Sequence, residues 1–531
     1  MTERAILFDT RSIQRYIFSG NTLKTNIGAS YLVEHIFEDI LLGDILSEEN
    51  RKRYDIESVD FDSWKQAVSP IHELPADCYV AYIGGGNALL LFEKKDSDFR
   101  KQIVTDFTMK LLITCPGLKT GVAIGDIDLT SPQNFQKSLN LMYKLLKHNQ
   151  NTIYPLVNVP YTGLTLTCNV NGETANYYDR HGLLDSLPRF FSQEVRAKTE
   201  AAKKANSALS HTFAAQLNGI YHFPMALDKL GQRESENDIA IVHIDGNQMG
   251  VRFSRCESLA ERSQLSREVK EQTETAFAKL LKSIVDEYPS YSQFLNLKQN
   301  MLPIRPLILG GDDITFVCPA RVALIYTKRF MDFMNQDLNI LTIGEQHAIA
   351  SCAGVAILPT AYPFFRGYQL AEQLCDAAKE QSRKNDSPTC WLDFAILHGE
   401  QAPELSQIRK QEYSGALGNM HFGPYRTDDD DDVHSLTALL RCATEFRDIL
   451  CRNQDTLPRN KIKEMRFVLQ RGMSDIHTFM EQWHHLELKM PDIPQWHAYQ
   501  ENLWFSTPGA PMRTPYIDAI EIMDHLPEIT E

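Results

Sequence analysis

At 531 residues the chain is too long for one hydrophobic core, and its 43% hydrophobic and 23% charged residues are ordinary for a globular protein, so we expect several domains. It contains no apolar run of about 18 residues that would cross a membrane and no signal-peptide pattern at its start, so we expect a cytoplasmic protein. The net charge of −15 argues against a surface that coats nucleic acid, and ten scattered cysteines without a C-x-x-C pair make disulfides and structural zinc improbable.

Three segments near the N-terminus recur in the same order about 230 residues later. A strand ending in an acid, AILFDTRSI, returns as IAIVHIDGNQMG. Two apolar runs around a glycine turn, CYVAYIGGGNALLLFE, return as PLILGGDDITFVCP, and the glycine-marked strand LKTGVAIGDI returns as AIASCAGVAIL. Helical patterns lie between them, so a duplicated β-α-β-β-α-β domain is the simplest interpretation.

A helix is predicted after the third strand of each copy, over 138–151 and 367–384. Between the copies, residues 189–206 form a basic helical stretch. After the second copy, the five aspartates of 428–432 are expected in a solvated loop that leads into helical patterns.

The basic stretch is expected to be a charged surface, because Glu194 and Glu200 stand four residues from Lys198 and Lys204. An RNA or partner-protein contact there is the alternative.

The segment 306–318 predicts a hairpin whose glycines make the turn and whose two aspartates, Asp312 and Asp313, lie at its tip. Asp245 ends the preceding strand of the same copy. In a β-α-β-β unit that strand lies beside the hairpin, so we expect the three carboxylates to converge. They repel one another strongly unless cations neutralise them.

Oxygen ligands of high charge favour Mg²⁺ or Mn²⁺, and a pair of such ions suits in-line attack on a phosphate. Gly246 and Gly310 would let phosphates and ions approach the backbone. Nucleotidyl transfer is the chemistry that this arrangement indicates. A GGDD turn alone is also a common turn composition; the third acid and the repeat favour the catalytic interpretation.

The strings HIDGNQMG, LILGGDDITFV and CAGVAI with PFFRGYQLAEQLCDAAKE resemble the second palm domain of the large polymerase-cyclase subunit of type III CRISPR effector complexes, a relative of the GGDEF nucleotide cyclases. The strings FDTRSIQRYIFSGNTLKTNIGASYLVEHI and YIGGGNALLLF resemble that family's first, degenerate palm. LDFAILHGE and GPYRTDD resemble the lead into its C-terminal helical domain.

The resemblance implies an α+β chain with two ferredoxin-like palm domains in tandem, a linker domain and a C-terminal helical domain. We expect the first palm over 1–155, the linker with the basic helix over 156–235, the second palm over 236–400 and the helical domain over 401–531.

The resemblance further implies that ATP binds between the palms and is joined into cyclic oligoadenylate, a defence messenger. The protein would bind Mg²⁺ or Mn²⁺. Its partners would be the small and backbone subunits of the effector complex with guide and target RNA. The residues carried over are the metal ligands and catalytic groups Asp245, Asp312 and Asp313, the turn glycines Gly310 and Gly311, the triphosphate contact Lys379, and the small residues Gly28, Ala29 and Ser30 facing a second nucleotide.

The sequence departs from the family in three places. Asn247 stands where a second acid is usual, so metal binding would depend more on the GGDD pair. No HD nuclease pattern precedes the first palm, so DNA cleavage is not expected. The zinc-binding insert keeps only Cys168.

Two further residues have structural interpretations. Asp9 takes the place of Asp245 in the first copy, but its hairpin ends in Asn87 without acids, so a structural role is expected and the first palm would be a binding half-site. His243 is expected to pack against a helix.

Two other functions remain open at this level: a catalytically idle scaffold that holds nucleotides or RNA, and a cyclic dinucleotide synthase that uses GTP. Intact acids at all three positions favour an enzyme, and gating by RNA, the nucleobase, ring size and oligomeric state are not determined by the sequence.

Overall fold

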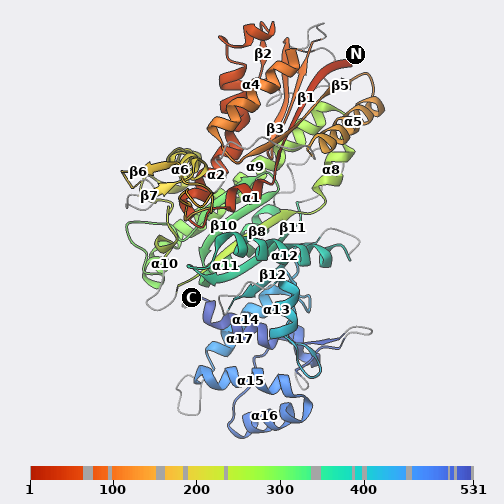
Figure 1. Ribbon diagram of the computed structural model, residues 1–531. Helices are drawn as coiled ribbons and strands as arrows, with labels where there is room; N and C mark the ends of the chain where they lie inside the picture. Colours follow the sequence, from red (N-terminus) through yellow and green to blue (C-terminus); the bar gives the residue numbers. More distant parts are fainter. Residues whose placement is uncertain are drawn as a thin grey trace.

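The computed structural model describes residues 2–63, 74, 76–93, 99–150, 162–182, 189–231, 237–336, 349–384, 389–397, 404–449, 457–499, 503–506 and 511–527. The chain forms an elongated molecule in which a first α+β unit, a second α+β unit and a helical C-terminal part follow one another along its length (Figure 1). The predicted α+β fold with two tandem palms and a helical part is confirmed.

The first palm is a five-stranded sheet with the order β2-β3-β4-β1-β5. The central strand β1 pairs antiparallel with both β4 and β5. Its elements are β1 Thr2–Arg11, α1 Ile13–Phe18, α2 Leu23–His35, the π-helical η1 Ile36–Ile45, η2 Arg51–Tyr54, β2 Val59–Asp60, β3 Cys78–Gly84, β4 Asn87–Phe92, α4 Phe99–Thr114, β5 Lys119–Asp128 and α5 Pro132–Gln150.

The second palm repeats this arrangement in a six-stranded sheet with the order β14-β12-β11-β8-β10-β9. The strand β8 takes the central place that β1 has in the first palm, between the hairpin β9–β10 and β11. Its elements are β8 Asp238–Gly246, α8 Met249–Arg255, α9 Leu259–Asp286, α10 Tyr288–Phe294, β9 Arg305–Gly310, β10 Asp313–Pro319, α11 Ala320–Gln336, β11 Ser351–Pro359, α12 Phe364–Ser382 and β12 Trp391–Ile396.

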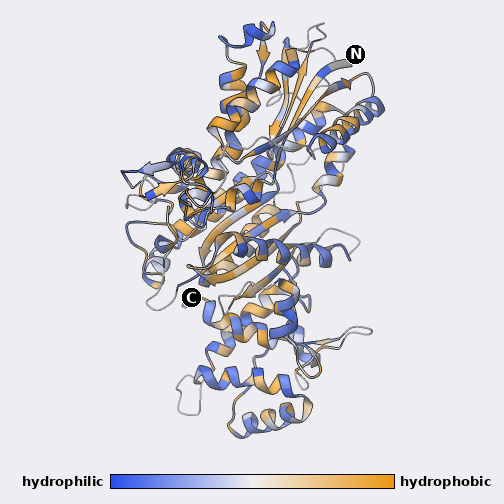
Figure 2. Ribbon diagram, in the orientation of Figure 1, coloured by the Kyte–Doolittle hydropathy of each residue, from blue (hydrophilic) through white to orange (hydrophobic). Residues whose placement is uncertain are grey.

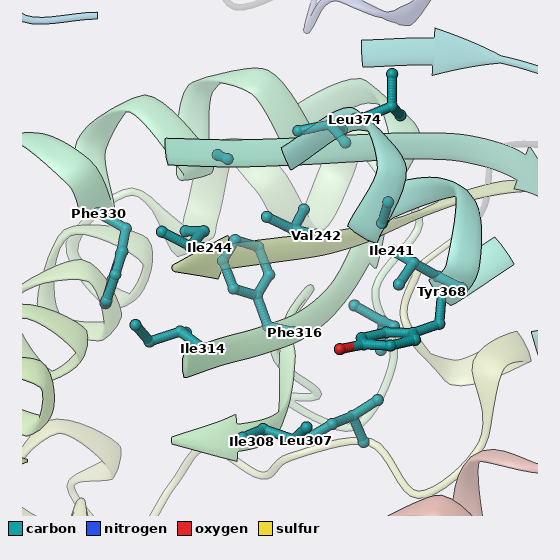
Figure 3. Packing of buried hydrophobic residues seen from close by; sticks show 14 of the residues in the cluster. Ile241, Val242, Ile244, Leu307, Ile308, Ile314, Phe316, Phe330, Tyr368 and Leu374 are labelled. Atoms are coloured by element: carbon teal, nitrogen blue, oxygen red, sulfur yellow. The ribbon is translucent and has the colours of Figure 1, made fainter. Parts of the chain in front are cut away.

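The core of the second palm forms because its strands are apolar on both faces. Residues 239–242 of β8 are all buried, and Figure 2 shows the strands of both sheets as mainly hydrophobic segments between helices of mixed character. Figure 3 shows the aliphatic side chains of β8, β9 and β10 with Phe330 from α11 and with Tyr368 and Leu374 from α12. Covering both faces with helices is what such strands require.

The two palms contact each other through helices. The ring of Phe18 on α1 stacks on Phe364 and Tyr368 of α12, with centroids 5.4 and 4.2 Å apart. On the other side of the pair, Gln136 of α5 donates to the carbonyl of Cys256, which follows α8, at 3.3 Å. The helices α5 and α12 therefore each lie against the short helix that follows the first strand of the other palm, which is α8 for α5 and α1 for α12.

The segment between the palms contains β6 Tyr177–Asp179, β7 Arg189–Phe191, α6 Gln193–Thr212, α7 Ala214–Leu217 and η3 Leu227–Lys229. The expected basic helix is α6, but it is not simply a charged surface. Lys198 is 1% exposed and donates to the carbonyl of Tyr16 and to Ser19, besides its ion pair with Glu194. Glu200 pairs with Arg196 at 2.9 Å, and no ion pair between Glu200 and Lys204 is present among the described residues.

The C-terminal part is mostly helical, with α13 Leu405–Glu412, α14 Leu436–Arg447, α15 Arg459–Arg471, α16 Met473–His485, η4 Pro494–Tyr499, α17 Tyr516–Ile522 and η5 Met523–His525. The short strands β13 Gly418–Asn419 and β15 Met512–Arg513 pair with each other, and β14 Tyr425–Arg426 extends the sheet of the second palm. Within the described residues, no helix has both the length and the apolar character needed to cross a bilayer.

The aspartate run is more than a solvated loop. Arg426 forms ion pairs with Asp428, Asp429 and Asp432 at 2.9, 3.2 and 3.2 Å. Asp428 also accepts from the backbone N–H of Cys390 at 3.0 Å, so the run ties the C-terminal part to the start of β12.

Candidate functional site

The candidate site lies at one end of the second sheet, where β8 meets the β9–β10 hairpin. Asp313 begins β10 directly opposite Asp245 of β8, and the backbone N–H of Gly246 donates to the carbonyl of Asp312 at 3.0 Å. Facing residues of antiparallel strands have neighbouring Cβ atoms on the same face of the sheet. The three acids are therefore adjacent, although 67 positions separate Asp245 from Asp312.

The hairpin turn depends on its second glycine. Gly311 has φ +71°, a conformation that costs other residues strain. Thr273 of α9 donates its hydroxyl to the carbonyl of Gly311, which anchors the turn from the helix behind it. No sequence pattern indicated Thr273, because the contact joins segments that only the fold brings together.

Gly246 is required for close packing beside the acids. A Cβ added there would lie 2.9 Å from the Cβ of Asp312 and 3.1 Å from Cγ of Met249. At Gly310 an added Cβ would find its nearest neighbour at 3.5 Å, which is ordinary contact. Of the three glycines beside the acids, Gly246 is explained by space and Gly311 by its backbone conformation, whereas neither explains Gly310.

The charges at the site are not balanced. Lys379 of α12 forms an ion pair with Asp245, and although burial lowers the pKa of Lys379, the charge of Asp245 raises it above its ordinary value. Burial and the charge of Asp245 raise the pKa of Asp312 to about 6 and that of Asp313 to about 7. One lysine thus leaves two carboxylates that hold protons more strongly than usual.

Only one of the two carboxylate oxygens of Asp313 accepts a hydrogen bond. Its side chain is 30% exposed, yet its Oδ1 atom is shielded from solvent and makes no hydrogen bond. The nearest polar group to that oxygen is Nδ1 of His243 at 3.5 Å, whose ring lies edge-on to Tyr368 of α12. The other oxygen accepts from Gln14 of α1 at 3.4 Å, so the first palm reaches the acids of the second.

A cavity of about 450 Å³ opens beside the turn, between the two palms. Its walls include the glycine turns of both copies, 84–86 and 309–311, and residues of α2 and α9. Its charged lining residues are the cations Arg267 and Lys270 and the acids Glu34, Glu38, Glu271 and Glu274. The cavity therefore lies between the glycine turns of the two hairpins, and Asp312 follows directly after its lining residue Gly311.

The remaining predicted residues lie elsewhere. Gly28 faces α6, where an added Cβ would be 1.7 Å from the carbonyl oxygen of Lys198, so this glycine serves helix packing, and Ala29 is buried. Ser30 lines a cavity of about 240 Å³ that adjoins the inter-palm cavity, since Glu34, Lys270 and Leu309 line both. Asn247 is buried and donates to Ser382 and to the carbonyl of Thr389 at 3.1 and 3.0 Å.

The first palm keeps the geometry but not the acids. Asn87 faces Asp9 in the register that Asp313 and Asp245 share in the second palm. Gln150, at the end of α5, donates to Asp9 in the place where Lys379 pairs with Asp245.

The donor chemistry of the second palm fits a hard divalent cation, since three carboxylates share one lysine and a shielded oxygen of Asp313 has no hydrogen bond. In the part of the chain that the structure describes, no three or more His, Cys, Asp or Glu side chains are arranged so that they could hold a metal ion together. Lys379 holds the oxygen of Asp245 that a cation would need.

Comparison with known proteins agrees with this geometry. Residues 238–387 match the family model described as Cas10/Cmr2, second palm domain. The resemblance of the second palm that the sequence predicts is therefore confirmed over these residues. No curated protein sequence matches the chain.

Two solved structures share the fold over 98% of this chain. They are the crystal structures of a Csm1-Csm4 cassette in complex with AMPPNP and with pppApApA, with TM-scores of 0.52 and 0.53 and 12% sequence identity. The chain spans 69% of the length of the matched chain in these two structures and 54% in the cassette with pppApA.

Proposed function

We propose that this chain is a nucleotidyltransferase that joins ATP into cyclic oligoadenylate in antiviral defence of the type III CRISPR kind. The observation that carries the proposal is the register that sets Asp313 opposite Asp245 with Asp312 beside them. Three acids that one lysine cannot neutralise are costly unless a cationic ligand binds.

In this proposal Asp245, Asp312 and Asp313 hold Mg²⁺ or Mn²⁺. Two such ions, when bound, would lower the pKa of an attacking ribose hydroxyl and stabilise the departing pyrophosphate. The contribution of the chain is positional. Thr273 fixes the turn, Gln14 orients Asp313, and Lys379 is the cation that moves from Asp245 to a phosphate when the divalent ions bind.

The inter-palm cavity supports binding of a nucleotide between the palms. Its volume of about 450 Å³ falls within the range of about 300–1,000 Å³ that is typical of small-molecule sites. The AMPPNP and pppApApA complexes of the Csm1-Csm4 cassettes favour adenine nucleotides, and those cassettes also suggest a Csm4-like partner.

The test is a product assay on the full chain. Pure protein is incubated with each of the four NTPs and Mg²⁺ or Mn²⁺, and products are identified by mass. We expect 3′–5′ linked cyclic oligoadenylate from ATP, no product in EDTA, and no product from Asp312→Ala/Asp313→Ala.

The matched control is Asp9→Ala, which removes the equivalent acid of the first palm. This variant should keep product formation, because Asp9 is bonded by Gln150 and faces Asn87. If the product is a cyclic dinucleotide made from GTP, it replaces the proposed product. If nucleotide binds but no product forms, both with and without partner subunits and RNA, the chain is a scaffold.

A further inference from the structure

Arg305, at the start of β9, is a buried cation far along the strand from the GGDD turn. Only 1% of Arg305 is exposed to solvent. Its Nη1 donates to Oδ1 of Asn206 on α6 at 2.6 Å and lies 3.8 Å from Sδ of Met225, and its guanidinium sits 5.7 Å from the ring centroid of Phe223. All three neighbours are neutral.

Among the residues that the structure describes, the charge of Arg305 has no counter-ion. No Asp or Glu among the described residues forms an ion pair with it, and burial without a neighbouring charge lowers the pKa of Arg305 to about 9, so it stays protonated at neutral pH. A buried charge without a partner is strongly unfavourable. A structural arginine is normally paired, and this one is not.

The guanidinium has one unused edge. Nε is buried and makes no hydrogen bond, and no described residue accepts one from Nη2. Nε–H and Nη2–H point in parallel along the same side of the planar group, which is the fork that binds two oxygens of an oxyanion. The protein uses the opposite end, Nη1, to hold the group in place.

Arg305 lines the cavity of about 240 Å³ that also contains Ser30. The cavity lies where α2, α6, α9 and β9 meet, and Ser30 and Tyr31 add hydroxyl groups to its wall. Glu34 and Glu274 are nearby, but each is close to Lys270, at 3.7 and 3.9 Å. The volume is below the range of about 300–1,000 Å³ that drug-sized ligands occupy, so a whole nucleotide is too large and a small anion fits.

We propose that this cavity binds a small oxyanion of the phosphate or pyrophosphate class on the free edge of Arg305. The site is distinct from the three aspartates and does not depend on the proposed catalytic function. It joins α6 of the linker, α2 of the first palm and β9 of the second, so an anion bound there would hold the three parts together.

The experiment titrates the full chain with sodium phosphate, pyrophosphate and sulfate by calorimetry and thermal unfolding, without nucleotide or divalent metal, against chloride at equal ionic strength. We expect a saturable rise in Tm with phosphate or pyrophosphate, and whichever binds more tightly identifies the source. Arg305→Met should weaken the apparent affinity at least about tenfold, because it removes a charge-assisted pair of hydrogen bonds.

Asn206→Asp is a second variant that preserves packing. It places a carboxylate at Nη1 of Arg305, so it should raise Tm without anion and reduce the anion-dependent shift. Arg321→Met, a buried arginine that lines a different cavity, is the control and should keep the shift. An unsaturable effect equal to that of chloride, or a full shift retained in both Arg305→Met and Asn206→Asp, would overturn the proposal.

Discussion

A buried histidine where the second palm meets the C-terminal part gives a pH-dependent prediction. Nε2 of His421 is 2.9 Å from Oδ1 of Asp393 on β12, and Nδ1 is 2.9 Å from Oδ1 of Asp518 on α17. Both ring nitrogens therefore face carboxylates, which only the imidazolium form can satisfy. Burial and Arg409 lower the pKa of His421, but the two acids outweigh them and raise it above 6.5.

The size of the effect follows from what the imidazolium neutralises. Asp393 is also paired with Arg409 at 2.9 Å, and its pKa is lowered to about 2, because Arg409 and His421 outweigh burial. His421→Asn would leave two acids and one arginine in a buried network. Removing one partner of a buried ion pair costs about 3–5 kcal/mol, and we expect a loss of that order in the free energy of unfolding.

The sign of the pH dependence distinguishes this interpretation from lost packing. Since the folded pKa of His421 is raised, its contribution is fully present below the unfolded pKa of 6.5 and is lost as pH rises through the folded pKa. The difference in urea stability between wild type and His421→Asn should therefore shrink as the pH increases. A difference that is constant from about pH 5 to 9 would refute a charged His421.

His434 is the matched control for this measurement. It is a partly buried histidine stacked on Phe422, with ring centroids 4.1 Å apart, and burial with the charge of Arg513 lowers its pKa to about 4. It is neutral when folded, so its contribution is present above the unfolded pKa and is lost as pH falls toward 4. His434→Asn should give the opposite slope, and equal slopes for the two variants would contradict the assignment.

Two other substitutions test packing and charge. Gly28→Ala should lower Tm, because the added methyl would lie 1.7 Å from the carbonyl oxygen of Lys198. Gly250→Ala is the control, since an added Cβ has nothing within 4 Å there, and it should stabilise its helix by up to about 1 kcal/mol. A rise in Tm for both variants would show that helix propensity outweighs packing at Gly28. Lys379→Met should weaken ATP binding in calorimetry, because it removes the proposed phosphate contact. It should not weaken Mn²⁺ binding, because it frees the oxygen of Asp245 that Lys379 pairs with. Loss of Mn²⁺ binding would contradict the exchange of Lys379 for a divalent ion.

The neighbourhood of the acids could be predicted because it follows from strand ends. Asp245 ends one strand and Asp313 begins another, and an antiparallel unit of this topology has to bring those ends together. In the first palm the same topology sets Asn87 opposite Asp9. Alternation and turn chemistry are local properties, so a single sequence displays them.

Contacts across domains left no such signal. Gln14 meets Asp313 across 299 positions and Arg305 meets Asn206 across 99, and neither residue type is unusual in its own segment. Lys198 shows the same limit. Its pairing with Glu194 follows from helical spacing, but its burial depends on α2 packing so closely that Gly28 touches the backbone of α6.

The two palms differ in the charge that gathers at the end of the first strand, which bears on the proposal that the second palm binds divalent ions. In the second palm three aspartates share one lysine, which leaves a formal excess of two negative charges (three minus one) at one end of the sheet. In the first palm Asp9 accepts a hydrogen bond from the neutral Gln150, and burial raises the pKa of Asp9 although Gln150 and the charge of Arg11 lower it. One shielded carboxyl can be satisfied by an amide or a proton. Two extra charges at a strand end are more than a single proton can neutralise, and this difference between the copies is why the proposed function assigns divalent ions to the second palm and not to the first.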